Sequence, residues 1–104
     1  MNDERRRVVV TGLGTVNPLG LDAPATWQAL LAGRSGVARI TAFDPSDYDC
    51  QIAAEVKGFD PSAYIDRKDA RRMDRYTHFA VAAAGEALRD SGLQITAENA
   101  DDVG

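Results

Sequence analysis

The sequence predicts an α/β fold, in which short strands alternate with helices along the chain. Two observations carry this prediction: a β-branched apolar run at residues 8–10 that leads into glycine, and an alanine-rich helical pattern that ends at Gly92. Three consecutive valines preceded by charged residues are typical of a short strand buried on both faces. A second apolar run at residues 51–57 is flanked by turn residues and is expected to form another strand.

Two helical regions are expected between and after these strands. Asp22 can cap the first region, and Gly33 takes the C-terminal position that favours glycine. The second region covers residues 66–91 and stops at Gly92, and Asp74 can divide it into a short basic helix and a long one. The long helix can approach a neighbour closely because many of its side chains are small: Ala80, Ala82, Ala83, Ala84 and Ala87.

The connecting segments contain two copies of Phe-Asp-Pro-Ser, which begin at Phe43 and Phe59. In each copy the aspartate can cap a helix and the proline fits its first position, so a brief helical turn is expected. A short extended piece is expected at residues 38–41. Residues 101–104 are interpreted as the first residues of a third strand.

Length and composition exclude several classes of protein. The 104 residues are enough for one small domain, and a net charge of −4 argues against a general nucleic-acid binder. No apolar run is long enough for a membrane span or for the core of a secretory signal. The single cysteine, Cys50, cannot form an internal disulfide. We therefore expect a cytoplasmic protein that has no membrane or nucleic-acid partner.

Five cations within nine residues form the strongest charge feature: Arg67, Lys68, Arg71, Arg72 and Arg75. On a continuous helix, all of them except Arg67 fall within one third of the circumference. If Asp74 restarts the helix, Lys68, Arg71 and Arg72 still share a face. Such a positive stripe suits an acidic protein partner. The alternative is a solvated face that neighbouring acids partly neutralise, namely Asp66, Asp69 and Asp74.

The glycines after the first strand leave a nucleotide-binding alternative open. Gly12 and Gly14 follow a strand, as in dinucleotide-binding turns. However, Asn17 stands where the third glycine of that motif belongs, and Pro18 delays the helix whose N-terminus would meet the pyrophosphate. We prefer the interpretation that the two glycines permit tight packing.

The remaining reactive side chains give weaker signals. Cys50 has no histidine or cation nearby in the sequence that would activate a thiol. His78 is the single histidine and cannot build a metal site by itself, so we expect it to be packed or on a helix surface. The adjacent Asp101 and Asp102 are expected in a solvated loop. No metal and no cofactor are predicted for this chain.

Taken together, these segments resemble the β-ketoacyl-acyl-carrier-protein synthases, and most nearly the synthase II type. The resemblance rests on Thr11-Gly-Leu-Gly and the Val16-Asn-Pro-Leu-Gly20 that comes after it, and it continues through residues 27–36, 67–74 and 90–93. It implies the incomplete N-terminal half of a thiolase-like fold, a mixed sheet packed between helices. Because such enzymes are much longer, residues 1–104 are expected to be a partial N-terminal synthase domain, cut at the start of its next strand.

The resemblance also implies a function, the decarboxylative condensation of acyl groups with malonyl-acyl-carrier protein in fatty-acid elongation. In this family the catalytic cysteine and two histidines lie C-terminal to the matched segment, so no catalytic residue is expected here and the chain alone should be inactive. Lys68, Arg71 and Arg72 match the family's residues that dock acyl carrier protein, and Arg67 and Arg75 flank them. The full-length protein is expected to be a homodimer. A small non-catalytic module that recruits an acidic protein remains the alternative.

Overall fold

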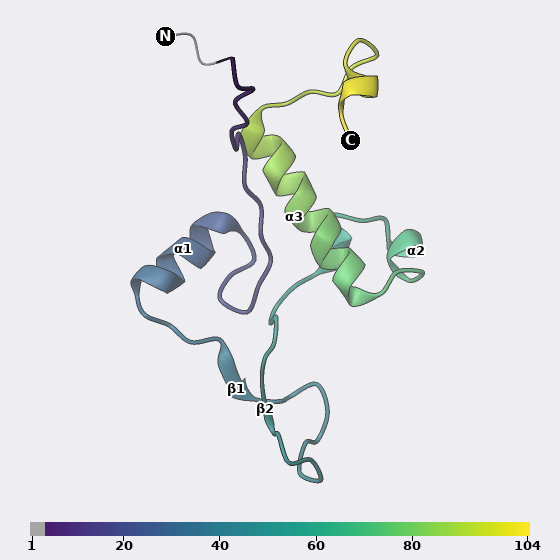
Figure 1. The fold of residues 1–104 in the computed structure, drawn as a ribbon. Helices are drawn as coiled ribbons and strands as arrows, with labels where there is room; N and C mark the ends of the chain where they lie inside the picture. Colours follow the sequence, from purple (N-terminus) through teal and green to yellow (C-terminus); the bar gives the residue numbers. More distant parts are fainter. Residues whose placement is uncertain (1–3) are drawn as a thin grey trace.

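The computed structural model describes residues 4–104, in which three α-helices and one two-stranded sheet are joined by long connections (Figure 1). The long helix α3 lies centrally, with α1 on one side and α2 on the other, and the hairpin of β1 and β2 projects away from the helices. The elements are, in chain order, α1 (Ala23–Leu31), β1 (Val37–Arg39), β2 (Ile52–Ala54), the 3-10 turn η1 (Pro61–Ala63), α2 (Arg67–Ala70), α3 (Arg75–Ser91) and the 3-10 turn η2 (Ala100–Asp102).

The helix boundaries confirm the predicted start and stop signals. The Asp22 carboxylate accepts a hydrogen bond from Ala25 N at 2.8 Å and so caps α1. Asp74 precedes the first residue of α3 and divides the basic helix from the long one, although its side chain makes no capping hydrogen bond. Gly92 ends α3 with φ of 70°, in the left-handed region where a Cβ is unfavourable.

The hairpin confirms the strand predicted within residues 51–57 and the extended piece before it. β1 and β2 are antiparallel, with Val37 opposite Ala54. Just beyond β2, the Glu55 carboxylate accepts hydrogen bonds from Thr41 N and Ala42 N and contacts Lys57 Nζ. The Thr41 amide bond, followed by Lys57 and Ala42, lowers the pKa of Glu55 to about 2. At neutral pH the Glu55 carboxylate is therefore charged, and the hydrogen bonds that it accepts connect the two sides of the hairpin.

The two Phe-Asp-Pro-Ser copies lead into different local structures. In the second copy Asp60 accepts from Ser62 N at 3.0 Å and caps η1, as expected. In the first copy Asp44 accepts from Ser46 N at 3.1 Å, but the chain then makes only a single turn, closed by Tyr48 N and Pro45 O at 3.0 Å. The helical turn is therefore confirmed for one copy.

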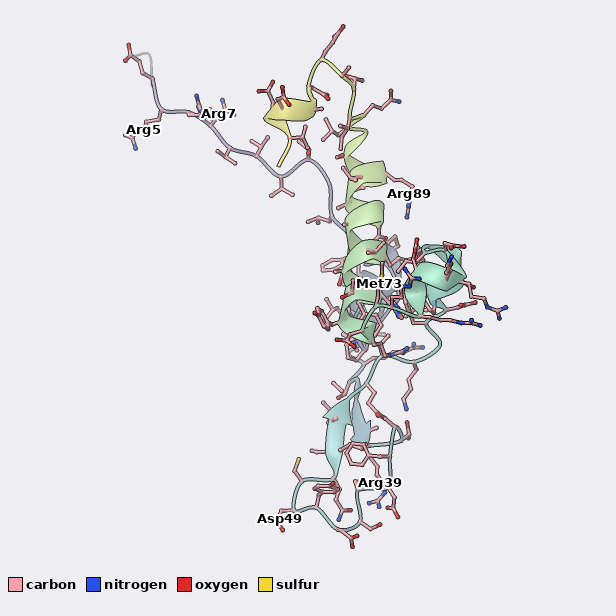
Figure 2. All side chains as sticks on the ribbon, turned by 90° about the vertical axis from the view of Figure 1, so that its right-hand side faces the viewer. Arg5, Arg7, Arg39, Asp49, Met73 and Arg89 are labelled. Atoms are coloured by element: carbon pink, nitrogen blue, oxygen red, sulfur yellow. The ribbon has the colours of Figure 1, made fainter. Side chains whose placement is uncertain are left out.

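The predicted strand at residues 8–10 is wrong for this structure. Val8, Val9 and Val10 are 89%, 67% and 79% exposed, and the extended segment pairs with no strand among the described residues. Figure 2 shows Arg5 and Arg7 on this segment, which stands away from the helices. An isolated extended segment cannot form a ladder, because each strand needs a neighbour to satisfy its backbone groups. The mixed sheet between helices is consequently not assembled within residues 4–104.

Residues 101–104, expected to be the first residues of a third strand, begin in the 3-10 turn η2, and the backbone becomes extended at Val103. Thr96 O accepts from Ala100 N at 2.9 Å, and the Asn99 side chain accepts from Thr96 N at 2.7 Å. These local bonds close a helical turn that competes with an extended conformation.

The described residues bury only a small core. Four hydrophobic side chains are buried, namely those of Ala29, Phe59, Ile65 and Ala82. The solvent-accessible surface is 8646 Å², whereas a compact protein of this mass exposes about 5,700 Å². The principal extents of 61 × 41 × 23 Å show the same open arrangement. Little apolar surface is thus removed from water to offset the conformational entropy lost on folding.

The isolated 104-residue chain is therefore expected to lack a cooperative unfolding transition. Its circular dichroism should change gradually on heating, and its amide resonances should be poorly dispersed, because most large apolar side chains are exposed to water. A sharp, reversible thermal transition with well-dispersed resonances would show instead that the chain is an autonomous domain.

Candidate functional site

The glycine-rich segment lies directly against α3, as the tight-packing interpretation predicts. A Cβ at Gly12 would lie 2.3 Å from Ala87 O, and a Cβ at Gly14 would lie 1.9 Å from Ala83 O. Both distances are far below van der Waals contact, so only glycine allows this backbone approach. Two of the alanines singled out in the sequence, Ala83 and Ala87, form the face that receives the segment.

Two carboxylates of α3 hold the same segment through its amides. Asp90 accepts from Leu13 N at 3.0 Å, and Glu86 accepts from Thr15 N at 2.9 Å. Glu86 also accepts from Ala23 N at 3.0 Å, the first residue of α1, and so joins α1 to α3. Since these amides already face negative charge, the segment offers no cradle for a pyrophosphate, which counts against the nucleotide-binding alternative.

Sequence reasoning missed Glu86 and Asp90. The available signal was their spacing, because residues four apart lie on the same face of a helix, here the face that carries Ala83 and Ala87. Their role could not be derived from the sequence, because the residues that they bind, Leu13 and Thr15, are 77 and 71 positions away along the chain.

The five cations are divided between two helices and the turn between them. Of the two arrangements considered from the sequence, the structure shows the helix divided at Asp74, because α2 ends at Ala70 and α3 begins only at Arg75. Arg71 is the C-cap of α2, and Arg72 lies in the next turn, where its amide donates to Asp69 O at 3.0 Å. Lys68 lies in α2, and Arg71 and Arg72 follow directly after it. We call these three exposed residues together the basic turn.

Arg75 is separated from the basic turn by its contacts. Its guanidinium lies over the Phe79 ring, with Cζ 5.0 Å from the ring centroid, and Nη2 donates to Val56 O at 3.3 Å. Phe79 in turn packs edge-to-face against the buried Phe59 at 5.1 Å. These contacts tie Arg75 to the aromatic core and to the end of the hairpin.

The basic turn remains unneutralised by direct contacts. Among the described residues, no carboxylate lies within ion-pair distance of Lys68, Arg71 or Arg72. Asp66, Asp69 and Asp74 are exposed beside these cations, so the alternative of a solvated face that they partly neutralise stays open. Arg67 differs from these three cations because it interacts with a carboxylate. Two hydrogen bonds from Ser62 lower the pKa of Asp60, and the positive charge of Arg67 lowers it further.

A hollow lies beside the basic turn, lined in part by Pro61, Arg67, Arg71 and His78. The half-buried His78 ring reaches across from α3, and its Nε2 donates a hydrogen bond to Ala70 O at 2.8 Å. The half-buried ring thus lies between the two expectations for His78, a packed residue or one on the helix surface, and it has a specific partner that the sequence did not indicate.

The other candidate side chains lie away from this surface. Cys50 is exposed in the loop between β1 and β2, where its Sγ lies 3.5 Å from Ile52 O. Figure 2 shows the neighbouring Asp49 and the hairpin residue Arg39 at the end of the hairpin that points away from the helices. Within residues 4–104, no cluster of three metal-ligating side chains comes together, and no helix is long and apolar enough to cross a membrane.

Comparisons with known proteins place this geometry in a family. Residues 5–104 match the family described as "Beta-ketoacyl synthase, N-terminal domain". The chain is 50% identical over 103 residues to a "3-oxoacyl-[acyl-carrier-protein] synthase 2" of Synechocystis and 54% identical over 101 residues to one of Coxiella burnetii. These matches cover 99% and 97% of this chain but only 25% and 24% of the relatives, so the chain spans about a quarter of their length.

Solved structures agree with this assignment. The ishigamide ketosynthase/chain length factor superimposes with a TM-score of 0.78 at 39% identity, covering 96% of this chain and 24% of the other. A β-ketoacyl synthase from Burkholderia phymatum gives a TM-score of 0.71 at 35% identity, covering 93% of this chain and 24% of that one. The helices and hairpin are therefore a small part of the thiolase-like fold, and the chain belongs to the β-ketoacyl synthase family.

Proposed function

We propose that residues 1–104 are the N-terminal part of a 3-oxoacyl-acyl-carrier-protein synthase that acts in fatty-acid chain elongation in the cytoplasm, as a homodimer. The observation that supports this most strongly is identity of 50% and 54% over nearly the whole chain to two proteins named as such synthases. The reaction transfers an acyl group to an enzyme cysteine. Malonyl-carrier protein then loses carbon dioxide, and its enolate carbon attacks the acyl carbon, which breaks the bond between the acyl carbon and the cysteine sulfur and releases the thiolate.

This part of the synthase would contribute recognition and not covalent chemistry. The acyl-accepting cysteine needs an activated sulfur, whereas Cys50 is exposed and its Sγ hydrogen-bonds the backbone carbonyl of Ile52. The basic turn, by contrast, presents three exposed cations that form no ion pair with a carboxylate within residues 4–104. A cationic surface of this kind steers an acidic protein into register. We therefore propose that Lys68, Arg71 and Arg72 dock acyl carrier protein, with Arg67 at the edge of the surface.

Acyl transfer tests this assignment directly. We expect a chimera in which this chain replaces the matching quarter of the Coxiella burnetii synthase to gain the mass of one acyl group from acyl-carrier protein. The isolated 104-residue chain should gain none, because it lacks the activated cysteine. Intact-mass spectrometry measures both. A chimera carrying Cys50→Ala is the matched control and should be acylated equally. A stoichiometric thioester on Cys50, or a folded chimera that is never acylated, would contradict the proposal.

A further inference from the structure

We propose that His78 is a positioning residue for carrier-protein docking, which fixes the basic turn on α3 through its hydrogen bond to Ala70 O. The inference rests on the proposed docking function and adds a residue outside the cationic group. In this role His78, the single histidine of the chain, does not contact the substrate. It acts by holding the backbone that carries the arginines.

The helix that carries the basic turn cannot hold its shape alone. α2 has only four residues, and its N-cap residue Asp66 makes no side-chain capping bond. A single turn is far below the length at which a helix is stable in water. None of its residues is buried. Its conformation must therefore be imposed by contacts with neighbouring elements.

His78 supplies such a contact at the end of α2 from which the basic turn continues. Ala70 is the last residue of the helix, and its carbonyl accepts from His78 Nε2 at 2.8 Å and from Met73 N at 3.2 Å. The two donors satisfy both lone pairs of a carbonyl that would otherwise be left open at the helix end. Figure 2 shows Met73 between α2 and α3.

This bond fixes the backbone from which the arginines project. Arg71 comes directly after Ala70, and the amides of Arg71 and Arg72 bond back to Arg67 O and Asp69 O. Since the imidazole is anchored on α3, whose first residue Arg75 is tied to Phe79 and Val56, the basic turn is connected to the aromatic cluster around the buried Phe59. Each exposed charge contributes little to binding a partner. The three cations bind more strongly together when they are already held in one arrangement, because less conformational entropy is then lost on binding.

Two substitutions at His78, made in the same chimera, test this. His78→Phe keeps a ring but removes the donor, and we expect it to raise KM for acyl-carrier-protein substrate about threefold to tenfold, the effect of losing one hydrogen bond. The kcat value and the activity on a small acyl-pantetheine thioester should stay within about twofold, since neither depends on docking. His78→Gln carries an N–H at a similar reach and should restore KM. If His78→Phe does not fold, His78→Ala, which needs no extra room, gives the same measurement.

Equal losses on both substrates, an unchanged KM in the donor-less variant, or failure of His78→Gln to restore KM would each overturn the positioning role. The result is separable from the docking proposal itself. If reversing the charges of the basic turn raises KM while His78→Phe does not, only the role of His78 fails. If neither change affects KM, the docking surface has been placed wrongly.

Discussion

Replacing Gly14 by alanine is expected to destabilise the synthase by about 3 kcal/mol or more, or to prevent folding, because overpacking against a rigid neighbour is costly. The added Cβ would lie 1.9 Å from Ala83 O and 2.7 Å from Ala87 N, which are backbone atoms of α3 and cannot rotate away. Relieving the clash would pull Thr15 N from Glu86 and separate the segment from α3. Urea unfolding of the chimera, monitored by circular dichroism, measures the loss.

Gly85→Ala is the matched control, since it makes the same change within α3. A Cβ there meets only the flexible Arg89 side chain at 3.3 Å, and alanine gains about 1 kcal/mol of helix propensity over glycine. This variant should be neutral or more stable. The double change Gly14→Ala/Ala83→Gly should give no rescue, because the clash involves the Ala83 carbonyl and not its methyl group. A Gly14→Ala protein as stable as the parent would contradict the close approach.

Reversing the basic turn with Lys68→Glu, Arg71→Glu and Arg72→Glu should raise KM for acyl-carrier-protein substrate about 10-fold to 100-fold. Each exposed charge pair is worth about 0.2–1 kcal/mol, and reversal adds repulsion to the loss of attraction, so the three effects sum. The kcat value should change little, because the cations do not touch the reacting atoms. The difference from the parent should shrink as salt is added, which screens exposed charges. Steady-state kinetics of the chimera at several salt concentrations provides the test.

The control for net charge is Arg6→Glu, Arg34→Glu and Arg89→Glu, which makes the same charge change at exposed positions outside α2 and the basic turn. It should leave KM close to that of the parent. Activity of the basic-turn variant on an acyl-pantetheine thioester should also be retained, since that substrate lacks the acidic protein. If both substrates lost activity equally, Lys68, Arg71 and Arg72 would be holding the fold and not the carrier protein.

Local signals in the sequence determined the helices and the hairpin. Asp22, Asp74 and Gly92 mark helix ends through bonds and dihedral angles within a few residues of each. These interactions need no distant partner, so a pattern in one segment was sufficient to predict them. The cation pattern and the likeness to the synthases came from the sequence as well, and the family comparisons confirm the likeness.

Contacts between distant segments could be decided only by the tertiary structure. The sequence predicted a buried strand at residues 8–10, but burial depends on neighbouring strands, and residues 4–104 provide none for it. It also placed Arg75 with the other cations, whereas contacts with Phe79 and Val56 O hold the exposed Arg75 side chain apart from them. The roles of Glu86 and His78 arise in the same way, through bonds to backbone atoms of other elements. Periodicity and capping patterns depend on residues that are close together along the chain. The partners of Arg75, Glu86 and His78 lie on other elements, so only the packing of those elements in three dimensions determines them.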